Sequence, residues 1–240
     1  MAYENGEWVL HGVSPDDPAC LHTPAELIRC VEEVGFLPLF QCRVKGLSVE
    51  ERTAPSGWWT DDPARDPWLW RAFLAAGGRV AYGKFFEKKA GFVSLDWLPF
   101  LANYRRGGYD FDARWDEQLA PHREERIMRL FAPGGELFSF EMRDRAGFGK
   151  GGEKNFEGTL ASLQMQTYLV MRDFRCRRNK RGEEYGWPIA VYTTPEQLWG
   201  YERVSAAYSE GPEESFERIV RHLCALCPEA EESAVRRLMR

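Results

Sequence analysis

The pattern of apolar and polar positions predicts helices that begin at capping residues and end at glycines. Thr23 and Glu26 form a capping box before a stretch with apolar residues at helical spacing, which ends at Gly35. Asp66–Pro67 begins a second such stretch, and Gly77–Gly78 ends it. The sequence therefore predicts two amphipathic helices in the first third of the chain.

The next segments alternate between extended and helical patterns. Two short aromatic and β-branched runs flank Lys88–Gly91, which predicts a β-hairpin over residues 79–94. Ser94 is expected to cap a helix over residues 95–106. Two further helices are predicted over residues 122–131 and 140–146.

A long helix followed by a hairpin is predicted in the third quarter of the chain. Asn155 is expected to cap a helix over residues 155–174, in which apolar residues recur at helical spacing. The following residues, 175–194, favour strands around Asn179–Gly182, a turn with glycine where positive φ is needed. Three helices and then a hairpin are the order of a winged helix-turn-helix, whose third helix reads a DNA groove while the hairpin, or wing, contacts the backbone.

The expected fold is α+β and mostly helical, with three parts. Residues 1–110 form an N-terminal module of helices and a hairpin, and residues 111–205 form the winged-helix module. The order of elements in the first module echoes the second, which suggests two tandem winged-helix-like modules, although no residue repeat supports this. Residues 206–240 contain two amphipathic helices separated by Pro228, expected to pack on the body or to form a homodimer.

Positive charge is concentrated in one part of an acidic chain. The 240 residues carry a formal net charge of −5, yet residues 143–181 hold ten Lys or Arg against four Asp or Glu. Such a basic patch on an acidic body indicates a directional surface for a polyanion, and the alternative is a solvated hairpin tip. The predicted DNA-binding residues are Lys150, Lys154, Arg172, Arg175, Arg177, Arg178, Lys180 and Arg181.

Other classes of protein are disfavoured. No run of eighteen apolar residues is present, and the first residues lack the pattern of a secretory signal, so we expect a cytoplasmic protein without a membrane partner. The six cysteines are scattered, and Cys224 and Cys227 have no second CxxC pair, so we expect reduced thiols and no metal site. The glycine-rich segment 147–158 lacks the strand and the GK[ST] ending of a phosphate loop. A group of carboxylates could serve in acid-base chemistry, but a helix N-cap followed by surface acids explains the same residues equally well. They are Asp110, Asp112 and Asp116.

Two stretches carry a resemblance to a known family. They are "AYGKFFEKKAGFVSLDWLPFLANYRRGGYDFDARWD" and "EGTLASLQMQTYLVMRDF", together with the basic hairpin after the second. These resemble proteins related to AlkZ, which with the similar YcaQ proteins are winged-helix DNA glycosylases that remove alkylated purines or unhook crosslinks. The resemblance implies tandem winged helices around a DNA channel, double-stranded DNA as the partner, hydrolase activity, and no metal or organic cofactor.

The same resemblance implies a catalytic pair. The family's glycosylases carry a Gln-x-Gln motif that positions the water attacking the sugar carbon, and this chain has Gln164-Met165-Gln166. On a helix, however, side chains two residues apart point about 200° away from each other. A structural role for Gln164 and Gln166 therefore stays open beside catalysis.

The predicted function is DNA binding by a winged-helix protein related to DNA glycosylases, acting on alkylated or crosslinked DNA. A transcriptional regulator that binds an operator as a dimer is one alternative. The other is a protein-interaction scaffold, for which the aromatic residues Tyr185 and Trp187 would matter more than the arginines.

Overall fold

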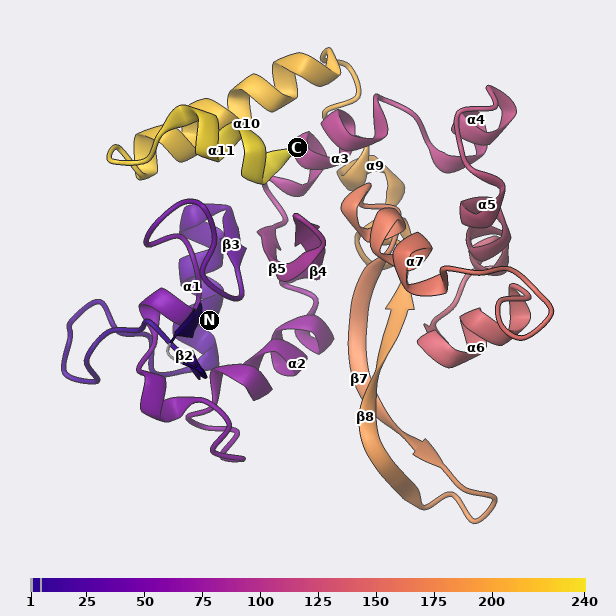
Figure 1. Ribbon diagram of the computed structural model, residues 1–240. Helices are drawn as coiled ribbons and strands as arrows, with labels where there is room; N and C mark the ends of the chain where they lie inside the picture. The colour runs from indigo at the N-terminus through magenta and orange to yellow at the C-terminus, as the bar shows by residue number, and fades with distance from the viewer. Residues whose placement is uncertain (1, 5) are drawn as a thin grey trace.

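The computed structural model describes residues 2–4 and 6–240, and it is an α+β protein (Figure 1). A first unit follows the order helix, strand, helix, strand, strand. Its elements are α1 (Pro24–Val34), β3 (Phe36–Pro38), α2 (Pro67–Gly77), β4 (Val80–Phe86) and β5 (Lys89–Ser94). Two short 3-10 turns, Glu50–Arg52 and Pro55–Gly57, lie between β3 and α2. The antiparallel sheet has the order β3-β5-β4, so the last strand lies between the other two.

A second unit is similar, with two α-helices instead of one between its first strand and its hairpin. Its elements are α5 (His122–Met128), the 3-10 turn Arg129–Phe131, β6 (Leu137–Phe138), α6 (Ser139–Arg145), α7 (Phe156–Met165), β7 (Val170–Arg178) and β8 (Glu184–Thr193). The sheet has the order β6-β8-β7, again with the last strand in the middle. Both units therefore share a strand order, although the sequence contains no residue repeat.

The remaining elements connect or cover the two units. They are β1 (Ala2–Glu4), β2 (Glu7–Val9), α3 (Leu98–Arg106), α4 (Phe111–Asp116), α8 (Pro195–Trp199), α9 (Tyr201–Val204), α10 (Pro212–Leu226) and α11 (Glu232–Met239). Helix α3 follows strand β5 of the first unit. Helix α10 packs on α3 and on α11, and both C-terminal helices lie beside the first unit in Figure 1. Within residues 2–4 and 6–240, no helix is both long enough and apolar enough to cross a membrane.

The predicted helix boundaries of the first unit are confirmed. The Thr23 hydroxyl accepts a hydrogen bond from the Glu26 N–H at 3.2 Å, and the Glu26 carboxylate accepts one from the His22 N–H at 2.7 Å. Asp66 likewise accepts from the Trp68 N–H at 2.8 Å. Satisfying these first N–H groups, which have no partner within the helix, fixes where each helix begins.

The prediction of one helix over residues 155–174 is wrong. Helix α7 ends at Met165, Thr167 has φ of 64°, and the chain then continues as strand β7 from Val170. Val170 and Phe174 lie four residues apart, a spacing that fits one face of a helix. A spacing of four also fits one face of a strand, where side chains alternate with a period of two, so the apolar pattern could not separate the two structures.

Two boundaries near residue 90 are also corrected. The turn of the first hairpin is Glu87–Lys88, with φ of 50° and 63°, rather than Lys88–Gly91. Ser94 caps no helix, since it pairs with Val80 as the last residue of β5. Helix α3 begins later, with Pro99 in its first turn, where proline's missing N–H has no helical partner to lose.

One hydrophobic core runs through both units. Tyr82 of β4 and Phe174 of β7 are ring neighbours, with centroids 6.1 Å apart. Arg105, at the end of α3, donates to the carbonyl oxygens of Met165 at 2.7 Å and of Met239 at 3.0 Å. Its positive charge therefore sits at the C-terminal ends of α7 and α11, where helix dipoles favour cations. Burial lowers the pKa of Arg105 to about 10, which leaves it charged at neutral pH.

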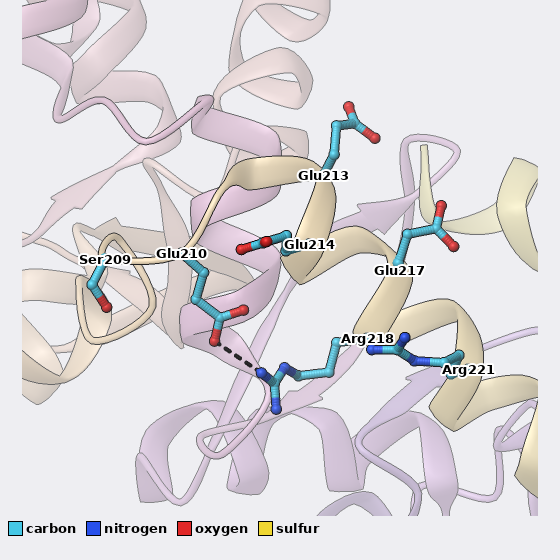
Figure 2. A pocket seen from close by; sticks show the side chains of 7 residues that line it. All are labelled: Ser209, Glu210, Glu213, Glu214, Glu217, Arg218 and Arg221. Carbon is cyan, nitrogen blue, oxygen red and sulfur yellow. Dashed lines mark hydrogen bonds and ion pairs between the residues drawn. The ribbon is translucent and has the colours of Figure 1, made fainter.

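The C-terminal helices use their apolar faces within the chain. Phe216 of α10 stacks on Tyr104 of α3 at 4.3 Å between ring centroids, and His222 stacks on Trp97 at 4.1 Å. The outward face of α10 is charged: Figure 2 shows Glu213 and Glu217 pointing away from the helix. A homodimer through these helices stays a prediction.

Candidate nucleic-acid interface

The hairpin β7–β8 projects from the body as a curved ribbon (Figure 1). Only its base joins the third strand, because β6 pairs with Val191 and Tyr192 of β8. Every residue from 177 to 188 is exposed. An isolated two-stranded ribbon is marginally stable in water, so the distal half of this hairpin contributes little to the core and presents its side chains to solvent.

The tip of the hairpin is the predicted turn at Asn179–Gly182. The Gly182 N–H donates to the Asn179 carbonyl oxygen at 2.9 Å, and Gly182 has φ of 82°, which glycine adopts without strain. The Asn179 side-chain oxygen accepts from the N–H groups of Arg181 at 2.8 Å and Glu183 at 3.1 Å. Asn179 thus fixes the loop that carries the two outermost cations.

Three of the predicted DNA-binding arginines have acidic partners. Arg172 pairs with Glu136 at 3.1 Å and also donates to the carbonyl oxygen of Ala76 at 2.6 Å, at the end of α2. Arg175 contacts Asp173 at 2.6 Å and Glu136 at 2.7 Å. Arg178 pairs across the hairpin with Glu184 at 3.0 Å, as residues opposite each other on neighbouring strands do. Their charge is therefore partly neutralised.

The other predicted cations have no acidic partner among the residues that the structure describes. The Arg177 guanidinium lies over the ring of Phe140, 4.3 Å from its centroid, an arrangement that orients the charge without neutralising it. Lys180 and Arg181 are exposed at the tip and make no ion pair with any residue that the structure describes. Lys150 and Lys154 are exposed in the loop before α7. No local pattern in the sequence indicates Phe140 or Glu136 as partners, since each lies more than thirty residues from its arginine.

The third helix of this unit does not present a groove-reading face, contrary to the prediction. Its buried side chains point to opposite sides of α7, because the helix packs between α5 and strand β4 of the first unit. Among its residues only Glu157 is exposed. The neighbouring unit therefore covers the surface with which such a helix would enter a groove.

Gln164 and Gln166 lie on different sides of the end of α7. The Gln164 side chain is fully buried, accepts from the Lys84 N–H at 3.1 Å and donates to the Leu160 carbonyl oxygen at 3.1 Å. Gln166 donates to the buried Glu124 carboxylate at 2.8 Å. Its own oxygen and the second oxygen of Glu124 are buried without a hydrogen-bond partner among the described residues. The structure does not bring the two glutamines together at an open cavity, and their catalytic role stays a prediction.

The aspartates at the start of α4 are separated by their contacts. Asp110 accepts a hydrogen bond from the Tyr201 hydroxyl at 2.8 Å, and this bond raises the pKa of Tyr201. Asp112 instead lines a surface hollow of about 370 Å³ with Trp115 and Glu125. Glu125 in turn pairs with Arg129. In the part of the chain that the structure describes, no group of three or more His, Cys, Asp or Glu residues could hold a metal ion.

Two units with the same strand order and a projecting, exposed basic hairpin define an α+β protein. A family model described as AlkZ related matches residues 21–240. The chain therefore belongs to the AlkZ-related family, which relates it to DNA-repair proteins of the glycosylase type. No curated protein and no solved structure matches the chain.

Proposed function

We propose that the chain binds double-stranded DNA, with the second unit acting as a winged helix and β7–β8 as its wing. The connectivity supports this: a helix, a short strand, two helices and a hairpin, with the last strand central, are the elements of a winged helix in their order. The first unit has the same strand order, with one helix between its first strand and its hairpin instead of two, and this supports tandem winged-helix-like units. Since α7 is covered, the wing rather than the third helix makes the DNA contact.

The observation that carries the proposal is the set of unpaired cations on the exposed half of the wing. Arg177, Lys180 and Arg181 are free to contact phosphates, while the remainder of the chain is acidic overall. Repulsion between that body and DNA favours an approach tip first. Lys150 and Lys154 extend the same positive region in the proposal, and Arg172, Arg175 and Arg178 contribute less because carboxylates hold them.

The test is duplex DNA binding at a series of salt concentrations. A variant with Arg177, Lys180 and Arg181 changed to Ala should bind more weakly and lower the slope of log K against log salt by up to about 2.7, about 0.9 per phosphate contact. The matched control changes three exposed arginines elsewhere, Arg29, Arg221 and Arg237, to Ala. If both variants lose affinity equally, or the native protein does not bind, the proposal is wrong.

Family membership favours damaged DNA as the substrate, so excision of alkylated bases is the second candidate function. Incubation of the protein with an alkylated duplex, followed by measurement of released base, tests it. Loss of release in the Gln166→Ala variant with unchanged duplex binding would support a catalytic role for that residue. A transcriptional regulator would instead show sequence-dependent affinity for undamaged DNA, and a scaffold would show no DNA binding.

A further inference from the structure

Strand β8 contains an irregularity that exposes a tryptophan. Arg175 pairs with Ile189, and Arg177, two residues later, pairs with Tyr185, four residues earlier on β8. The three residues Gly186 to Pro188 therefore form a bulge opposite the single residue Cys176. The Trp187 side chain at the middle of this bulge is 88% exposed.

The residues around Trp187 are suited to hold such a bulge. Gly186 has φ of 78°, a conformation that glycine adopts without strain, and its carbonyl oxygen faces the Cys176 thiol with 3.6 Å from sulfur to oxygen. Pro188 has no N–H to give to the ladder, so the bulge loses no backbone hydrogen bond there. Bulges re-aim side chains and are treated as built features of a sheet. The local sequence therefore directs one large aromatic ring into solvent.

The surroundings of the ring favour nucleic acid as its partner. A tryptophan is highly buried on average, so one that a bulge directs into solvent beside exposed cations offers a contact surface for a ligand. The same ribbon carries the unpaired cations Arg177, Lys180 and Arg181, so an approaching ligand must be anionic as well as flat and apolar. A nucleobase on its phosphate backbone has both properties, and base stacking on aromatic side chains tolerates any sequence.

We propose that Trp187 stacks on an unpaired base, so that the wing prefers DNA whose base stacking is interrupted. In an intact duplex every base face is already covered by its neighbours, and the ring has nothing to stack on except where the duplex opens. The phosphate contacts of the wing then hold the protein on any DNA, and Trp187 adds affinity where a base is exposed. This inference rests on the proposed function, since the wing must first contact DNA.

The test compares an intact duplex with the same duplex carrying one unpaired adenine. The native protein is expected to bind the bulged duplex about tenfold more tightly, in line with the free energy of one base stacked on an aromatic side chain. Trp187→Ala should remove this preference while leaving affinity for the intact duplex unchanged. Trp187→Phe should retain most of the preference, because the ring is kept.

The control is Trp59→Ala, which removes another exposed tryptophan from the first unit. Because Trp187 lies in solvent, its substitutions should leave the melting temperature unchanged, and a calorimetric scan checks this. Equal affinity of the native protein for both duplexes, or a preference that survives in Trp187→Ala, overturns the stacking proposal alone. Failure of the native protein to bind either duplex overturns the proposed function and this inference with it.

Discussion

The Gln164 side-chain oxygen accepts a hydrogen bond from the Lys84 backbone N–H at 3.1 Å, which joins helix α7 of the second unit to strand β4 of the first. The same amide donates to the Leu160 carbonyl oxygen, so both of its polar groups are used inside the protein. This contact explains two features together. It holds the two units in contact. It also buries α7, the helix whose counterpart in a winged helix ordinarily contacts DNA.

Gln164→Ala should therefore destabilise the protein by about 2–3 kcal/mol, since it leaves the Lys84 N–H without its acceptor and opens a small cavity. Urea unfolding followed by circular dichroism measures this. Gln118→Ala, at an exposed position, serves as the control and should leave the free energy of unfolding unchanged. A Gln164→Ala variant of native stability would contradict the structural role.

Arg172 differs from the tip cations because it connects the base of the wing to α2. It donates to the Ala76 carbonyl oxygen and pairs with Glu136, so its guanidinium already has partners within the protein. Arg172→Ala should lower the free energy of unfolding by about 1.5–3 kcal/mol, the net value of hydrogen bonds that involve a charged group.

The same variant should leave the salt dependence of duplex binding unchanged. Lys180→Ala, by contrast, should leave stability unchanged and reduce the salt slope by up to about 0.9. Measuring both quantities for both variants separates the two roles. A reduced salt slope in Arg172→Ala at native stability would show instead that this arginine contacts phosphate.

Local signals in the sequence were enough to predict the helices whose capping residue directly precedes them and the turns that need glycine. Thr23, Asp66 and Gly182 each act within four residues of their partners, so a short stretch of sequence contains the whole interaction. The strands β3 and β6 were not predicted, because three and two residues are too few to show a period. Without them the shared sheet order of the two units could not be recognised.

The candidate interface was predicted only as a set of charges. The hairpin and its basic residues follow from the sequence, but which cations stay unpaired depends on Glu136 and Phe140, which approach the wing through the fold of the second unit. The burial of α7 likewise depends on contact with β4, about eighty residues earlier in the chain. Such long-range contacts leave no trace in local periodicity or spacing.

The Cys42 thiol is expected to react slowly with alkylating agents. Burial raises its pKa to about 11, and the thiol contacts the Val44 carbonyl oxygen at 3.4 Å. Its alkylation by iodoacetamide at pH 8 should be at least about tenfold slower than that of an unstructured peptide thiol with a pKa near 8.5. Mass spectrometry of the modified protein measures the rate.

The same shift has a defined effect on stability. Because the folded state raises the pKa of this thiol, it favours the protonated form, and the stability that this contributes is present below about pH 8.5 and lost as the pH rises toward about 11. Cys42→Ser should remove that part of the pH dependence. Alkylation of Cys42 at the rate of the peptide would show that the thiol is open to solvent and contradict both expectations.

The tip of the wing should be ordered locally by Asn179. Its side chain accepts from the N–H groups of Arg181 and Glu183, and donates to the Glu183 carboxylate at 2.8 Å. Asn179→Ala removes all three hydrogen bonds, yet residues 179–182 of the tip are exposed and contribute little burial. Global stability should therefore change by less than about 1 kcal/mol, as for surface substitutions generally.

Amide hydrogen exchange at Arg181 and Glu183 should accelerate strongly in the Asn179→Ala variant, since these N–H groups lose their acceptor. Duplex affinity should fall by a few fold, because a loop that must be ordered on binding costs free energy that a preorganised loop does not. Asn179→Asp keeps the acceptor and should retain slow exchange, which makes it the matched control. Unchanged exchange in Asn179→Ala would show that the backbone turn, with Gly182 at positive φ, orders the tip without the side chain.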